Sequence, residues 1–144
     1  MEVIPIQSGQ KFFHQLMMLY RPFENQLNVE LNKHKLHRAQ WTILYYLYNF
    51  GSATLVEIAN YQGVEKPTIT RTFSRLEELG YVEQLAGKDK REKRMQLTIL
   101  GRTVYEQVRV TIDQFEEECL KGISEEEQQK IIQIMEKVRS NLMK

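Results

Sequence analysis

Hydrophobic residues recur along the first part of the chain at the spacing of an amphipathic helix. They follow one another at steps of three or four residues: Phe13, Leu16, Tyr20, Phe23, Leu27 and Leu31. This periodicity places them on one face of a long helix. Pro22 lies inside the pattern and has no backbone N–H, so we expect a kink or a break near Arg21. A second helix is expected over residues 38–50, and Gly51 follows its end.

Capping and glycine signals divide the next segment into two shorter helices. Thr54 and Glu57 have the spacing of a capping box, with the threonine as N-cap of the first helix. Gly63 breaks the chain, and Pro67 fits the first turn of the second helix, where its missing N–H costs nothing. Gly80 ends that helix. Two helices joined by a tight turn are typical of a helix-turn-helix unit.

The rest of the chain predicts a hairpin and two more helices. Residues 81–85 and 94–97 have the pattern of two short strands on either side of a polar tip. A long helix is expected over residues 99–122, and Ser124 with Glu127 repeats the capping box before a last helix. The predicted fold is therefore mainly α, with a small β-hairpin after the helix-turn-helix.

The second short helix carries polar and basic residues on the side opposite its apolar face. These residues are Lys66, Thr68, Thr70, Arg71, Ser74 and Arg75. A helix-turn-helix holds its second helix out toward the major groove of DNA. Arg and Lys can pair with guanine O6 and N7, and Thr can contact bases, thymine methyl groups or phosphate. The face therefore indicates DNA reading; a solvated basic helix face is the alternative explanation.

The tip of the hairpin concentrates positive charge. The whole chain has 20 basic and 19 acidic residues, whereas residues 87–94 hold five basic and two acidic residues, a net charge of +3. Arg94 supplies one of the five charges, and the candidate DNA contacts of the tip are Lys88, Lys90, Arg91 and Lys93. Basic elements next to a reading helix form an electrostatic footprint for a phosphate backbone, and such a tip can enter the minor groove. A solubilising loop is the alternative.

In their order and spacing, these residues resemble the MarR family of winged helix-turn-helix transcriptional regulators. The resemblance covers roughly residues 10–142 and rests on these motifs: Gln40–Trp41, Leu55, Ile58–Ala59, Val64, Lys66–Pro67–Thr68, Thr70–Arg71, Gly80–Tyr81–Val82, Asp89–Lys90–Arg91, Leu97–Thr98 and Gly101–Arg102. It implies a homodimer in which residues 1–37 and 107–144 form a helical dimerisation region. Residues 38–106 would form the winged domain that binds double-stranded DNA. Repression from a pseudo-palindromic operator is the family's usual mode.

The resemblance also implies roles for single residues. The major-groove contacts would be Thr68, Thr70, Arg71 and Arg75. In the wing, Asp89 would orient Arg91 or a neighbouring arginine. Many family members release DNA when a small aromatic or phenolic ligand binds, and the pocket for such an effector would comprise Phe13, Met17, Tyr20, Trp41 and Tyr45. Because these residue types are equally typical of an ordinary core, we favour a core position for any single one of them.

The remaining reactive residues do not predict an enzyme. The chain has no G-x-S-x-G, H-E-x-x-H, CxxC or phosphate-binding glycine loop, so we expect no catalytic activity and no cofactor. The main alternative to a regulator is a winged-helix module for protein–protein assembly. The single cysteine suits a reducing cytoplasm, and we expect neither a targeting signal nor a membrane partner.

The cysteine and two of the histidines are the candidates for a sensing role. Cys119 falls on the apolar stripe of the long helix, which favours a buried structural thiol. His34 and His37, with Glu30, could approach one another at a helix end. Their spacing crosses a turn and includes no cysteine cluster, so no metal site is expected there.

Overall fold

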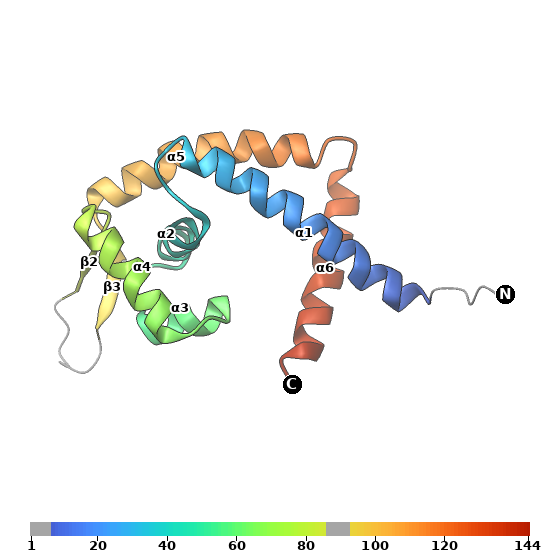
Figure 1. Ribbon diagram of the computed structural model, residues 1–144, viewed down its shortest axis with the longest axis horizontal. Helices are drawn as coiled ribbons and strands as arrows, with labels where there is room; N and C mark the ends of the chain where they lie inside the picture. The colour runs from blue at the N-terminus through green and yellow to red at the C-terminus, as the bar shows by residue number, and fades with distance from the viewer. Residues whose placement is uncertain (1–6, 86–92) are drawn as a thin grey trace. The chain divides into compact units, whose positions relative to one another are not determined.

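A computed structural model of the chain describes residues 7–85 and 93–144. The helices and strands of the described part, in chain order, are α1 (Ser8–Asn32), α2 (Arg38–Phe50), β1 (Ala53–Thr54), α3 (Leu55–Gln62), α4 (Lys66–Glu78), β2 (Val82–Gln84), β3 (Arg94–Leu97), α5 (Ile99–Cys119) and α6 (Glu125–Leu142) (Figure 1). The chain divides into two compact units, residues 1–112 and residues 113–144. The boundary falls within α5, so the winged domain and the start of α5 belong to the first unit.

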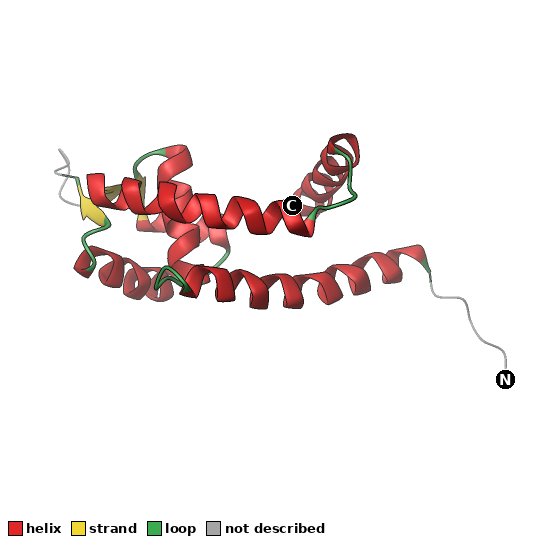
Figure 2. Cartoon of the chain, turned by 90° about the horizontal axis from the view of Figure 1, so that it is seen from above, coloured by secondary structure: helices red, strands yellow, loops and turns green. Residues whose placement is uncertain are grey.

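The first helix runs without interruption through its proline. Pro22 lies inside α1, and Figure 2 shows the helix that leads from the N-terminus as one continuous element. The predicted break near Arg21 is therefore wrong. The fixed φ of proline suits a helix, and the lost hydrogen bond is to the carbonyl of Met18, an exposed residue to which water has access. Leu27 and Leu31 bury the end of α1.

The core of the first unit lies between α2, α3, α4 and the start of α5. Residues that are fully or almost fully buried come from all of these elements: Ile43, Leu44, Ile58, Phe73, Leu76, Val108 and Ile112. The turn between α3 and α4 closes at Gly63, whose φ of 68° is in the left-handed region that favours glycine. Its N–H and that of Val64 return to the carbonyls at the end of α3. The predicted helix-turn-helix is present.

The hairpin belongs to a three-stranded antiparallel sheet in the order β1-β3-β2. Val82 pairs with Leu97 in the hairpin, and Ala53 pairs with Met95 on the other side of β3. The strand β1 was not predicted because two residues carry no periodicity. It ends at Thr54, whose hydroxyl accepts a hydrogen bond from the N–H of Glu57 at 3.1 Å and caps α3 as expected.

The start of α5 is fastened to the base of the hairpin. The hydroxyl of Thr98 donates to the carbonyl of Gly80 at 2.6 Å and accepts from the N–H of Gly101 at 2.9 Å. The N–H of Thr98 donates to the carbonyl of Tyr81 at 3.0 Å. A Cβ atom on Gly101 would lie 1.9 Å from the Tyr81 carbonyl oxygen, so the close approach requires glycine.

The second unit contains the end of α5 and the whole of α6. Ser124 and Glu127 form the predicted capping box, with each side chain bonding the other residue's N–H at 3.0 to 3.1 Å. These bonds lower the pKa of the Glu127 carboxyl, because the Ser124 N–H and hydroxyl favour its ionised form. The prediction of a buried thiol is wrong for this chain: Cys119 is exposed. It is the last residue of α5, seven residues beyond Ile112, at which the buried part of the helix ends.

Candidate nucleic-acid interface

Helix α4 has one buried face and one exposed face. Ile69, Phe73 and Leu76 are at most 2% exposed and hold the helix in the core. The six residues predicted for DNA reading on this helix are all exposed: Lys66, Thr68, Thr70, Arg71, Ser74 and Arg75. The period of 3.6 residues separates the two sets, because positions 69, 73 and 76 follow one another at steps of four and three. The helix thus presents a polar, basic surface on a rigid support.

The hydroxyl groups of α4 bond to the helix itself. Thr70 donates to the carbonyl of Lys66 at 3.0 Å, and Ser74 donates to the carbonyl of Thr70 at 3.0 Å. Thr72 makes the same bond to the carbonyl of Thr68 at 3.1 Å. In each case the hydroxyl proton is taken by the carbonyl one turn earlier, so that the oxygen lone pairs and any methyl group remain for other contacts.

The two arginines of this face differ in their surroundings. Arg75 lies 3.0 Å from the carboxylate of Glu78, and both side chains are more than half exposed. Such a surface pair contributes less than about 1 kcal/mol and competes weakly with a phosphate or a base. Arg71 has no ion-pair partner within residues 7–85 and 93–144. Its five guanidinium donors are therefore available to an external acceptor.

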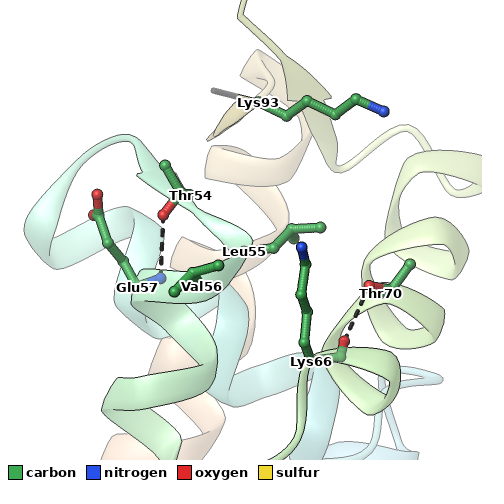
Figure 3. Close-up of a pocket in the computed structure, with 7 residues that line it drawn as sticks. All are labelled: Thr54, Leu55, Val56, Glu57, Lys66, Thr70 and Lys93. Atoms are coloured by element: carbon green, nitrogen blue, oxygen red, sulfur yellow. Dashed lines mark hydrogen bonds between the residues drawn. The ribbon is translucent and has the colours of Figure 1, made fainter. Parts of the chain in front are cut away.

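A cleft opens between the first turns of α3 and α4 and the base of the hairpin. Its volume is about 590 Å³, and it is lined by Thr54, Leu55, Val56, Glu57, Lys66, Thr70 and Lys93. Both lysines of this lining are labelled in Figure 3, Lys66 at the start of α4 and Lys93 just before β3. Glu57, the single acidic group among the described residues of the lining, lies 3.3 Å from the guanidinium of Arg94. Among the described residues of the lining, no unpaired carboxylate neutralises the charges of Lys66 and Lys93. The cleft is therefore suited to binding an anion.

The structure corrects the charge count of the hairpin tip. Arg94 donates to the Ser52 carbonyl at 2.8 Å and lies 3.3 Å from the Glu57 carboxylate, so it joins β3 to the segment before α3. Its charge pairs with Glu57 inside the domain, so Arg94 does not add to the positive charge that the hairpin tip offers to DNA. Lys93 is described and exposed. The other predicted wing residues lie outside the described residues: Lys88, Asp89, Lys90 and Arg91.

The five residues predicted for an effector pocket do not share one environment. Trp41 is 6% exposed and stacks on Tyr105 with 4.8 Å between ring centroids. Four of the five are exposed in the single chain: Phe13, Met17, Tyr20 and Tyr45. Within the single chain, Trp41 therefore has a core position and the other four do not. They lie on exposed helix surfaces that one copy of the protein leaves uncovered.

A stack of rings and guanidinium groups joins α2 to α5. Tyr105 is sandwiched between Trp41 at 4.8 Å and Tyr48 at 4.3 Å. Arg109 lies over the Trp41 ring and Arg102 over the Tyr48 ring, at 5.5 and 5.1 Å from the centroids. Sequence reasoning missed this arrangement, since α2 and α5 are separated in the sequence by α3, α4 and the hairpin. Only the spacing of residues 102, 105 and 109 on one helix face pointed to a shared surface.

Two polar contacts complete the junction between the first helices and α5. The Tyr48 hydroxyl donates to Glu106 at 3.1 Å, and this hydrogen bond to a carboxylate raises the pKa of Tyr48. His34 Nε2 lies 2.8 Å from the Thr111 hydroxyl, so one histidine of the considered metal pair already has a polar partner on α5. Within the described residues, no group of three or more His, Cys, Asp or Glu side chains has metal-binding geometry.

Comparison with known proteins places this geometry in a family. The model of the MarR family matches residues 34–92. YwoH of Bacillus subtilis (strain 168), an uncharacterized HTH-type transcriptional regulator, is 40% identical over 116 residues, which are 81% of this chain and 85% of that protein. The chain belongs to the MarR family of transcriptional regulators. In this DNA-binding family the fold is a winged helix-turn-helix, and here α3, α4 and the hairpin have that arrangement.

Solved MarR structures share the whole fold. Staphylococcus aureus MarR in complex with salicylate and kanamycin is 29% identical, with a TM-score of 0.83 over 94% of this chain and 92% of that chain. A mutant of E. coli MarR complexed with operator DNA is 25% identical, with a TM-score of 0.78 over 89% of this chain and 93% of that chain. The described helices include none with the length and apolarity needed to cross a bilayer.

Proposed function

We propose that this chain is a homodimeric repressor that binds a pseudo-palindromic operator through α4 and the hairpin. The observation that carries the proposal is the division of α4 into two faces. Ile69, Phe73 and Leu76 anchor the helix, while all of its predicted reading residues are exposed on the other side. E. coli MarR, which has the same fold, has been solved with its operator.

The residues divide by chemistry into base readers and phosphate binders. Arg71 has the planar donor fork that pairs with guanine O6 and N7, and it has no competing partner among the described side chains. Lys66 and Lys93 line one cleft and bind a phosphate of the DNA backbone. Lys88, Lys90 and Arg91 add to the wing charge, and Asp89 orients Arg91.

The proposed dimer follows from apolar surface that one chain leaves exposed. In α1, the exposed residues include Phe12, Phe13, Leu16, Met17 and Leu19. In α6, which buries no residue, they include Ile131, Ile134, Met135 and Leu142. Exposed apolar faces of this length mark a contact with a partner. A two-fold dimer built on residues 1–37 and 107–144 presents two copies of α4 about one turn of DNA apart.

We further propose that a small aromatic anion releases this regulator from DNA. S. aureus MarR has been solved with salicylate. In this chain, Phe13, Met17, Tyr20 and Tyr45 offer exposed aromatic and thioether surface, and the Tyr20 hydroxyl lies 2.8 Å from the Arg38 guanidinium. A ligand changes DNA affinity only if it prefers the form that does not bind the operator. Loss of operator affinity on adding salicylate tests this part.

Operator selection from a random duplex library tests the DNA-binding function. Wild type is expected to enrich a palindromic sequence, with an affinity that falls steeply as salt rises. Arg71→Ala should lose about 1–3 kcal/mol of specific binding and relax the preference at one position of each half-site. Arg71→Lys is the matched variant, because it keeps the charge and loses the bidentate fork. It should keep the salt dependence while losing the same base preference.

The assembly module remains the second candidate function. It predicts no enriched sequence, and weak DNA binding that is the same for wild type, Arg71→Ala and Lys33→Ala. Lys33 lies at the end of α1, outside α4 and the cleft, and controls for the loss of one positive charge. An equal effect of both variants would remove Arg71 from the proposed interface.

A further inference from the structure

The side chain of Thr70 lies on the exposed face of α4. Its hydroxyl donates to the carbonyl of Lys66 at 3.0 Å, as Figure 3 shows. The acceptors of the major groove are guanine O6 and N7, adenine N7 and thymine O4. Because the hydroxyl proton is already bonded inside the helix, Thr70 has no proton to donate to any of these atoms.

The surroundings of Thr70 are also apolar on one side. Thr70 is exposed, and it lines the same cleft as Leu55 and Val56, whose side chain is 50% exposed. When Oγ1 turns back along the helix toward the carbonyl, the γ-methyl group is the remaining substituent of Cβ that can meet an approaching surface. Thr70 therefore offers DNA a methyl group on the edge of an apolar strip, beside an oxygen that can accept hydrogen bonds but not donate them.

The major groove has one apolar feature that a methyl group can recognise. This feature is the C5-methyl group of thymine, which distinguishes thymine from the other bases by shape and not by hydrogen bonding. We infer that Thr70 selects thymine through contact of its γ-methyl group with the C5-methyl group. The inference rests on the proposed operator binding and assigns one base preference to one side chain.

Two neighbours on α4 serve as internal comparisons. Ser74 is exposed and bonds its hydroxyl to the carbonyl of Thr70 in the same way, but it has no methyl group. Thr72 has the same side chain and the same backbone bond, but it is partly buried and lines a different cleft, between α2, α3 and α4. Neither is expected to respond to a thymine methyl group, so both serve as negative controls for position 70.

The test removes the methyl group from each partner in turn. In the selected operator, each thymine is replaced singly by 2′-deoxyuridine, which lacks only the C5-methyl group. Wild type should lose about fourfold in affinity at one thymine of each half-site, and about 15-fold when both are replaced, the effect of about one buried methylene-sized group per site. Thr70→Val keeps the methyl group and should keep this sensitivity. Thr70→Ser keeps the hydroxyl and should lose it.

The variants differ little in helix propensity, and melting curves confirm that each folds. Thr72→Ser and Thr72→Val are the matched controls and should keep the wild-type response to deoxyuridine. The inference is overturned if wild type tolerates deoxyuridine at every position, if Thr70→Ser remains as sensitive as wild type, or if Thr70→Val binds as poorly as Thr70→Ser. If wild type enriches no operator in the selection experiment, the proposed function itself is refuted. That result is obtained before any variant is made, so the two failures can be told apart.

Discussion

Replacing Gly101 by alanine tests how tightly the wing is fastened to α5. The new Cβ atom would lie 1.9 Å from the carbonyl oxygen of Tyr81, and Cβ atoms essentially never approach other heavy atoms closer than 3.0 Å. The start of α5 and the base of the hairpin must therefore separate by about 1.1 Å. The neighbour is backbone and not the end of a flexible side chain, so the strain cannot be relieved by a rotamer change.

The magnitude follows from the contacts that this separation disturbs. Forcing an extra methyl group into a packed site costs about 1–3 kcal/mol. Lengthening the bonds from Thr98 to Gly80 and Tyr81, which are 2.6 and 3.0 Å long, adds about 0.5–1.5 kcal/mol each. The better helix propensity of alanine offsets up to about 1 kcal/mol. We expect the free energy of unfolding to fall by about 1–6 kcal/mol, with weaker operator binding because the wing shifts.

Urea unfolding followed by circular dichroism measures the change, at one protein concentration because the stability of a dimer depends on concentration. Gly9→Ala is the matched control, since Gly9 is also helical and has no heavy atom within 4 Å of its would-be Cβ. It should unfold at or slightly above the wild-type midpoint. If Gly101→Ala unfolds at the same urea concentration as Gly9→Ala, the close packing of α5 on the hairpin is wrong.

Three more substitutions each remove the contacts of one side chain. Arg94→Ala should destabilise the domain by about 1–3 kcal/mol in urea unfolding, because β3 loses its bonds to the segment before α3; an unchanged midpoint would mean that Arg94 belongs to the free tip after all. Glu106→Gln should bring the pKa of Tyr48 down toward its ordinary value near 10, and titration of tyrosinate absorbance would contradict this if the curve did not move. Ser124→Ala should raise the pKa of Glu127 and reduce helix content. The stabilisation from this carboxylate is present at neutral pH and is lost as the pH falls through its lowered pKa, so wild type and variant should differ less in acid; an equal difference at all pH values would exclude the link.

The period of the buried residues explains why most of the fold could be predicted. The bounds of α2 agree with the expectation of residues 38–50, because a run of apolar positions ends at a glycine. The exposed face of α4 was predicted for the same reason: Ile69, Phe73 and Leu76 determine which side points inward. Local chemistry and periodicity suffice for such features.

The features that were missed depend on contacts between distant segments. The two-residue strand β1 exists only because β3 pairs with it. Arg94 was counted as one charge in a basic run, and only the fold brings Ser52 and Glu57 to it. Pro22 was given too much weight as a helix breaker, since an exposed helix turn tolerates one lost hydrogen bond. The burial of Cys119 depended on where packing along α5 stops, which no periodicity reveals.

The division of α4 into two faces also bears on how such a regulator changes over evolution. The residues that anchor the helix share no position with those that would meet the operator, and the hydroxyls of Thr70 and Ser74 are satisfied by the helix itself. A substitution on the outer face therefore leaves the core intact and leaves no buried polar group without a hydrogen-bond partner. After gene duplication, a copy can acquire a new target sequence one residue at a time while every intermediate still folds, and a protein engineer can follow the same route.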